Sequence, residues 1–105
     1  MRRGRDDPAY RGRYGGDVVA RDGAYHEGTV WGWLIGPWVA ALLRCGVSRE
    51  IARSYLEPYR HHLDRYGVGT LAEIADGDAP FAPRGAIAQA WTVASVLEAW
   101  RATMP

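Results

Sequence analysis

Apolar residues recur at helical spacing in three stretches of the chain, separated by segments rich in polar residues and glycine. Over 30–44 the apolar positions follow a 3.6-residue period, and Thr29 stands where an N-cap is expected. A second periodic stretch runs over 49–66 and contains Pro58, and a third runs over 87–101. The pattern predicts three helices over these ranges, with the second bent or divided at Pro58.

Two segments lack this periodicity. Residues 1–24 combine Arg, Gly, Asp and Pro, a composition that predicts an extended arm without regular structure. Residues 67–86 are dense in Gly, Pro and Asp and predict a loop. No alternating pattern typical of a strand competes with the helices. The predicted fold class is therefore all-α, with residues 1–24 as the arm and 25–105 as the helical part.

The helices predicted over 30–44 and 87–101 are apolar over most of their circumference. Such helices are normally covered on several faces, and three short helices offer few neighbours. The pattern therefore indicates missing partners, either in another chain or in a further N-terminal region of the same polypeptide. The helical spacing of Trp38, Trp91 and Trp100 indicates core positions for these three rings.

The composition narrows the classes of function only slightly. All 13 basic residues among the 105 are Arg, and the net charge of +1 provides no global attraction to nucleic acid or membrane. Six of the 13 lie in the first 22 positions, so an Arg-rich arm that binds nucleic acid or an acidic partner remains one hypothesis. The apolar run WGWLIGPWVAALL is too short to span a bilayer. A cytoplasmic protein is expected.

Cys45 is the sole cysteine, which excludes an intramolecular disulfide and a cysteine metal cluster. Its place at the end of an apolar stretch indicates a packing thiol. His61 and His62 lack a ligand partner at helical spacing and are interpreted as solvated surface residues. No cofactor and no metal site are predicted.

Three carboxylates lie within six positions of the 67–86 loop. Asp76 and Asp78 are explained by turn formation. Glu73 lies between Leu71 and Ile74, and an apolar setting would suit its carboxyl group to general acid or base work.

The segments YRGRYGGD, RDGAYHEGTVWGWLIGPW and GVGTLAEIADGDAPFAPRGAIAQAW resemble, in order and spacing, the C-terminal end of the glycogen debranching enzyme family. The resemblance is to its amylo-α-1,6-glucosidase domain and runs from about Tyr10 to Trp100. It implies an (α/α)6 barrel, of which this chain would supply the last three helices. It also implies hydrolysis, with inversion, of α-1,6-linked glucose on glycogen or a related branched α-glucan.

The resemblance also implies roles for particular residues. The family's general base matches Glu73 in TLAEIADGD, while its general acid lies upstream of the matched region. The HxGTxW motif places His26, Thr29 and Trp31 in the wall of a glucose pocket. Trp33, at the start of the same predicted helix, is a further candidate for a substrate-binding ring, with a core position as the alternative.

Three hypotheses about function follow. The first is a C-terminal fragment of a debranching glucosidase that is inactive alone because it lacks the general acid and most of the barrel. The second is a complementing subunit, to which an upstream chain supplies the remaining helices. The third is the small helical binding module with an Arg-rich arm. Under the first two the partners are a branched α-glucan and the completing part of the barrel, with no nucleic acid and no membrane.

Overall fold

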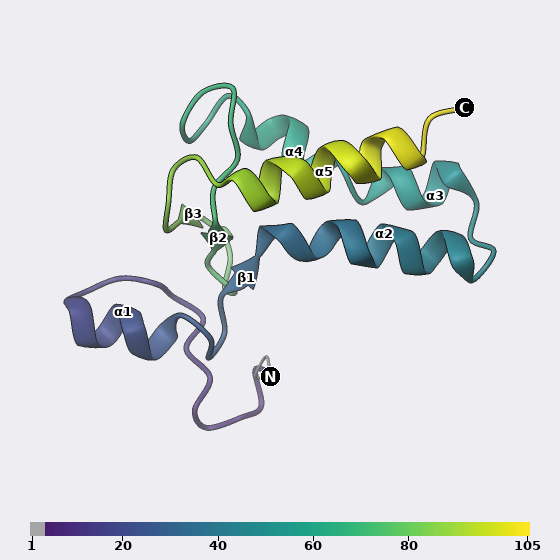
Figure 1. Ribbon diagram of the computed structural model, residues 1–105. Helices are drawn as coiled ribbons and strands as arrows, with labels where there is room; N and C mark the ends of the chain where they lie inside the picture. Colours follow the sequence, from purple (N-terminus) through teal and green to yellow (C-terminus); the bar gives the residue numbers. More distant parts are fainter. Residues whose placement is uncertain (1–3) are drawn as a thin grey trace.

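A computed structural model describes residues 4–105 as a group of packed helices, an N-terminal arm and a small sheet between them (Figure 1). The Cα atoms extend over 45 × 32 × 20 Å. In chain order the elements are α1 (Val18–Ala24), β1 (Val30–Trp31), the 3-10 helix η1 (Gly32–Leu34), α2 (Ile35–Arg44), α3 (Arg49–Ser54), α4 (Glu57–His62), β2 (Ile74–Ala75), β3 (Pro83–Arg84) and α5 (Ala90–Ala102).

Helices α2 and α5 lie side by side, and α3 contacts both of them. The buried core joins Val39 of α2, Ala52 of α3, Leu56 before α4 and Ala99 of α5. Gly36 lets α2 approach α5 closely, because a Cβ at this position would lie 2.8 Å from Ser95 Oγ.

Two of the three predicted helices are present with altered limits. The stretch over 49–66 forms α3 and α4, and Pro58 lies in the first turn of α4, where its missing N–H removes no helical hydrogen bond. The helix predicted over 87–101 begins three residues later and ends at Ala102. The predicted division of the 49–66 helix is confirmed by the break between α3 and α4, with Pro58 at the start of α4.

The helix predicted over 30–44 is correct only from Ile35 onward. Val30 and Trp31 form β1, and a 3-10 turn separates this strand from α2. Thr29 is not an N-cap, since its Oγ1 donates backwards to the Tyr25 carbonyl at 2.6 Å. Pairing with β2, a strand distant in the sequence, replaces the helical hydrogen bonds, and local periodicity does not reveal such a partner.

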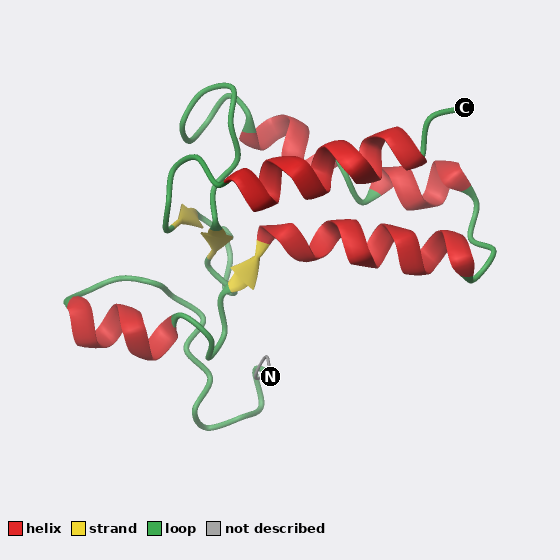
Figure 2. Ribbon diagram, viewed as in Figure 1, coloured by secondary structure: helices red, strands yellow, loops and turns green. Residues whose placement is uncertain are grey.

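The sheet was not predicted from the sequence. The strands, which are yellow in Figure 2, have the order β1-β2-β3, and both pairs are antiparallel. Trp31 lies opposite Ile74, which lies opposite Arg84. Strands of two residues are too short to display an alternating pattern. The fold is therefore mainly helical, with a small sheet at the junction with the arm.

The arm is better ordered than predicted over its described residues, 4–24. It contains α1, whose N-cap Asp17 accepts a hydrogen bond from Ala20 N at 2.8 Å. Gly12 O accepts from Gly77 N at 2.7 Å, and Asp76 Oδ1 accepts from Tyr14 N at 2.9 Å. The loop after β2 thus fixes the arm against the sheet. Residues 1–3 of the predicted arm lie outside the described range.

Several residues predicted to be buried are exposed. The exposed fractions of Trp38 and Trp91 are 48% and 68%, so their assignment to the core is wrong for this chain. Cys45 is also exposed, and Leu97 of α5 is 64% exposed. Trp100 does pack against the core, with the Arg53 guanidinium 4.3 Å from its ring centre. None of the described helices has the length and apolar character needed to cross a membrane.

Candidate functional site

Glu73 lies immediately before β2 and lines a hollow of about 560 Å³, named here the Glu73 hollow. Residues of the arm, of the β2–β3 region and of the loop after α4 form its walls. Its aromatic and charged lining, apart from Glu73 itself, consists of Tyr14, Tyr25, Tyr66, Arg21, Arg84 and Asp22.

Both the backbone and the side chain of Glu73 are fixed. Its N–H donates to Ala86 O at 3.0 Å, and its carbonyl accepts from Gly32 N at 3.2 Å. Oε2 accepts from Ala86 N at 3.0 Å, and Oε1 accepts from the Tyr25 hydroxyl. The carboxylate therefore connects the segment before β2 to the arm and to the residues after β3.

The apolar neighbours of Glu73 in the sequence do not surround its carboxylate. Ala72 and Ile74 are buried and line a different cavity, because successive side chains of extended backbone point to opposite faces. Polar and aromatic groups line the Glu73 hollow instead. The predicted apolar setting of this carboxylate is therefore wrong.

Gly85 gives the carboxylate its space. A Cβ built on Gly85 would lie 2.5 Å from Glu73 Oε2, and the φ of +70° at this position is one that residues with a side chain rarely adopt. The Gly85 carbonyl accepts a hydrogen bond from the Tyr66 hydroxyl at 3.3 Å. Glycine therefore suits this position by its conformation, and a side chain here would displace the Glu73 carboxylate from its observed place.

Tyr25 ends α1 and is held at its backbone by two donors. Thr29 Oγ1 and Trp31 Nε1 donate to its carbonyl at 2.6 and 3.0 Å. Burial, followed by the hydrogen bond with Glu73, raises the pKa of Tyr25 to about 12. The hydroxyl is therefore neutral near pH 7 and donates to the carboxylate.

The residues of the HxGTxW motif pack on Tyr25. The Tyr25 ring meets the Trp31 ring edge-on, with centroids 4.6 Å apart, and His26 stacks on Trp31 at 5.2 Å. His26 is exposed, Trp31 is half-buried and Thr29 is buried. None of the three is among the described residues that line the Glu73 hollow.

Trp33 lies apart from this cluster. Its ring contacts that of Trp91 edge-on, with centroids 6.2 Å apart. Of the four predicted substrate-binding residues, three gather behind Tyr25 and the fourth does not join them. Sequence reasoning missed Tyr25 and Tyr66 because neither has a distinctive spacing, although Tyr25 directly precedes the HxGTxW motif.

Arg84 and Asp76 form an ion pair at the edge of the hollow. Arg84 Nη2 lies 3.0 Å from Asp76 Oδ2, and this contact raises the pKa of the guanidinium. The Asp76 side chain is only 5% exposed and also accepts from Tyr14 N. Its role is to join the arm to β3, which corrects its interpretation as a simple turn residue.

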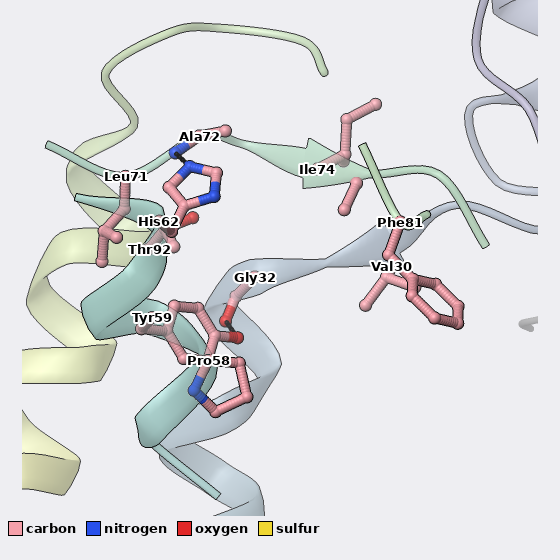
Figure 3. Close-up of a pocket in the computed structure, with 11 residues that line it drawn as sticks. Val30, Gly32, Pro58, Tyr59, His62, Leu71, Ala72, Ile74, Phe81 and Thr92 are labelled. Atoms are coloured by element: carbon pink, nitrogen blue, oxygen red, sulfur yellow. Dashed lines mark hydrogen bonds between the residues drawn. The ribbon is translucent and has the colours of Figure 1, made fainter. Parts of the chain in front are cut away.

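A second cavity, of about 230 Å³, lies between the sheet, α4 and the start of α5 (Figure 3). Its walls are mainly apolar, and the Tyr59 hydroxyl donates to Gly32 O at 3.1 Å at its edge. Thr92 Oγ1 is buried with no hydrogen-bond partner among the described residues. This apolar cavity contains no carboxylate in its described lining and provides no hydrolytic pair.

His62 lines the apolar cavity and is half-buried, so its interpretation as a solvated surface residue is wrong. Its Nε2 accepts from Ala72 N at 3.2 Å, and burial lowers its pKa. Across residues 4–105, His, Cys, Asp and Glu form no group of three or more that could hold a metal ion.

A family model described as amylo-alpha-1,6-glucosidase matches residues 3–98 of the chain. No curated protein and no solved structure matches the chain. The matched range includes α1, which Tyr25 ends, as well as Glu73 and Gly85. The whole Glu73 hollow therefore lies inside the region that the family model describes.

Proposed function

The chain belongs to the amylo-α-1,6-glucosidase family, and from that premise we propose that it forms the C-terminal part of a glucosidase that removes α-1,6-linked glucose from glycogen or a related branched α-glucan, with inversion. Glu73 is the proposed general base. The observation that carries the proposal is the Glu73 carboxylate, oriented by two donors at the wall of a polar, aromatic hollow.

The contacts of Glu73 leave it able to act as a base. A carboxylate offers about four acceptor positions, two on each oxygen. Tyr25 and Ala86 each use one, so one position on each oxygen remains for a water molecule. Glu73 would take a proton from this water molecule while the water oxygen attacks the anomeric carbon. The bond from that carbon to the glucan oxygen breaks, and a general acid protonates the departing oxygen.

The general acid must lie opposite the base, at about 6.5 to 9.5 Å, to leave room for the water. We propose that further residues, in the same polypeptide or in a complementing chain, bring this acid together with the other helices of an (α/α)6 barrel. The exposed apolar side chains of Trp38, Trp91 and Leu97 support this proposal, because additional helices would cover them. The chain alone is expected to be inactive.

Co-production with the polypeptide encoded immediately upstream tests the proposal. Glucose release from an oligosaccharide with an α-1,6-linked glucosyl branch is expected only when both are present, with β-glucose as the first anomer detected by NMR. Glu73→Gln is expected to abolish release and to leave glucan binding intact, because the amide keeps the shape of the side chain and loses the base. Retained hydrolysis by this variant would contradict the assignment.

Asp22 provides the matched control, since it is a second carboxylate in the lining of the same hollow. Asp22→Asn is expected to retain activity in the completed enzyme, because the acid comes from elsewhere. Loss of hydrolysis with retained binding would instead assign the acid to Asp22 and make the completing part unnecessary for that role.

Within the described part of the arm, residues 4–24, the contacts of Arg5 and Arg21 offer no specific support for a nucleic-acid-binding module. Arg5 Nη2 donates to Gly77 O and Arg21 Nη1 donates to Gly16 O, both at 3.0 Å, so these guanidinium groups bind the chain's own carbonyls. We therefore propose no binding function based on the arm.

A further inference from the structure

The hydroxyl of Tyr25 reaches across 48 residues of sequence to the proposed base. It donates to Glu73 Oε1, and Ala86 N, in the segment after β3, donates to Oε2. Each carboxylate oxygen thus has its own donor. Without the Tyr25 hydroxyl, Oε1 would keep no protein donor among the hydrogen bonds of the described residues, and the carboxylate would be held at Oε2 alone.

Tyr25 is itself fixed by the residues that follow it. Thr29 Oγ1 and Trp31 Nε1 share its carbonyl as their acceptor, and the Trp31 ring packs against its ring. His26 contacts the Tyr25 ring edge-on, with centroids 5.0 Å apart, and stacks on Trp31. The chain can therefore place the hydroxyl with little freedom, because both ends of the residue are held.

We propose that Tyr25 is the positioning residue for Glu73, and that Thr29, Trp31 and His26 act on the site through Tyr25 without touching the substrate. This inference rests on the proposed function in taking Glu73 as the base. The hydroxyl fixes the direction in which the carboxylate presents its remaining acceptor positions to water. A base must lie within hydrogen-bond reach of the proton it removes, so loss of this orientation lowers the rate of the chemical step.

The first test is spectroscopic and needs no activity. In the 105-residue chain, a Tyr25 hydroxyl proton that is hydrogen-bonded to a carboxylate should give an NMR signal protected from exchange with water. Tyr25→Phe should remove the signal because it removes the proton, and Glu73→Ala should remove it because it removes the acceptor. Tyr66→Phe is the matched control, because Tyr66 lines the same hollow but donates to a backbone carbonyl, and this variant should retain the signal. Absence of the signal in the unmodified chain, or its persistence in Glu73→Ala, would overturn the inference.

The second test is kinetic and uses the completed enzyme. Tyr25→Phe should lower kcat on the order of 10- to 100-fold, the factor that corresponds to one hydrogen bond to a charged group. It should also move the acid limb of the pH–rate profile, whereas KM should change little. Tyr66→Phe should leave the pH profile in place. A Tyr25→Phe enzyme with the original kcat and pH profile would contradict the positioning role.

A double-mutant cycle tests the indirect role of Thr29. Thr29→Val removes the donor to the Tyr25 carbonyl and should lower kcat in the unmodified enzyme. In the Tyr25→Phe background the same change should have almost no further effect on kcat, because the hydroxyl that it orients is gone. Additive losses, or a change confined to KM, would show direct substrate contact and refute this part of the inference.

The two proposals can fail separately. If Glu73→Gln hydrolyses the substrate normally, the general-base assignment fails, while the NMR signal still decides whether Tyr25 holds Glu73. If Glu73→Gln is inactive but Tyr25→Phe behaves as the unmodified enzyme, the function stands and the positioning role falls.

Discussion

At the scale of single residues, Glu73 and its two sequence neighbours line two separate cavities. Ala72 and Ile74 line the apolar cavity, and Glu73 between them lines the polar hollow. The alternation of extended backbone produces this separation, and Gly85 makes it sterically possible by leaving room for Oε2. The environment of the proposed base thus depends on a residue that carries no side chain at all.

Gly85→Ala is predicted to affect both stability and the site. The left-handed conformation should lower the free energy of unfolding by about 1 to 2 kcal/mol, and the added Cβ, 2.5 Å from Oε2, should displace the carboxylate and reduce glucose release by the completed enzyme. Gly69→Ala is the matched control: Gly69 has φ +81°, and a Cβ added there would meet nothing within 4 Å. It should lose similar stability in urea denaturation and keep its activity. Equal activity of the two variants would refute the steric argument.

At the scale of elements, a histidine of α4 binds the backbone of the segment that leads into β2. His62 is the last residue of α4, and its Nε2 accepts a hydrogen bond from Ala72 N, shortly before β2. This hydrogen bond requires an unprotonated Nε2. Burial lowers the pKa of His62 below its usual 6.5. The unfolded chain therefore binds a proton at this residue more readily than the folded chain does.

The linkage predicts the direction of a pH effect. Stability from His62 is present above pH 6.5, the ordinary pKa, and is lost as the pH falls through the lowered pKa of the folded state. The free energy of unfolding, measured in urea at about pH 7.5 and about pH 5.5, should therefore fall on acidification. His62→Gln should reduce this difference, because an amide oxygen can accept from Ala72 N without titrating. His61→Gln, which changes the exposed neighbour, should leave it unchanged, and an equal reduction in both variants would argue against the assignment.

At the scale of the whole molecule, the buried core is small and several large apolar side chains are exposed. Val39, Ala52, Leu56 and Ala99 form a small buried cluster, whereas Leu97 lines an exposed, mainly apolar groove between α5 and the residues around α4. In the proposed barrel the completing helices would cover such positions. The groove should therefore contribute to assembly and little to the stability of the chain alone.

Leu97→Lys is predicted to change the free energy of unfolding of the chain by no more than about 0.5 kcal/mol, as is usual for exposed positions. It should weaken association with the completing polypeptide, measured by calorimetry, because a charge would be buried at the contact. Val68→Lys is the control, since Val68 is 83% exposed in the loop after α4 and does not line this groove. Unchanged association of Leu97→Lys would refute the assignment of this face to the barrel contact.

The sequence by itself determined the features that are encoded locally. Apolar residues three and four positions apart located α2, α5 and the divided helix at Pro58, and the family resemblance pointed to Glu73. Local patterns could not determine the two-residue strands, which are too short for a pattern. They could not determine the exposure of Trp38 and Trp91 either, because exposure depends on which elements pack against a ring.

Only the tertiary structure decided how the site is assembled. Thr29 has the residue type and position of an N-cap, yet its hydroxyl binds the Tyr25 carbonyl because β1 pairs with β2 and replaces the first helical turn. The contact between Tyr25 and Glu73 joins residues 48 positions apart, and no local periodicity specifies such a pair. Side-chain period is a property of neighbouring residues in one chain segment, whereas the orientation of the proposed base depends on where the arm, the sheet and Gly85 meet in space.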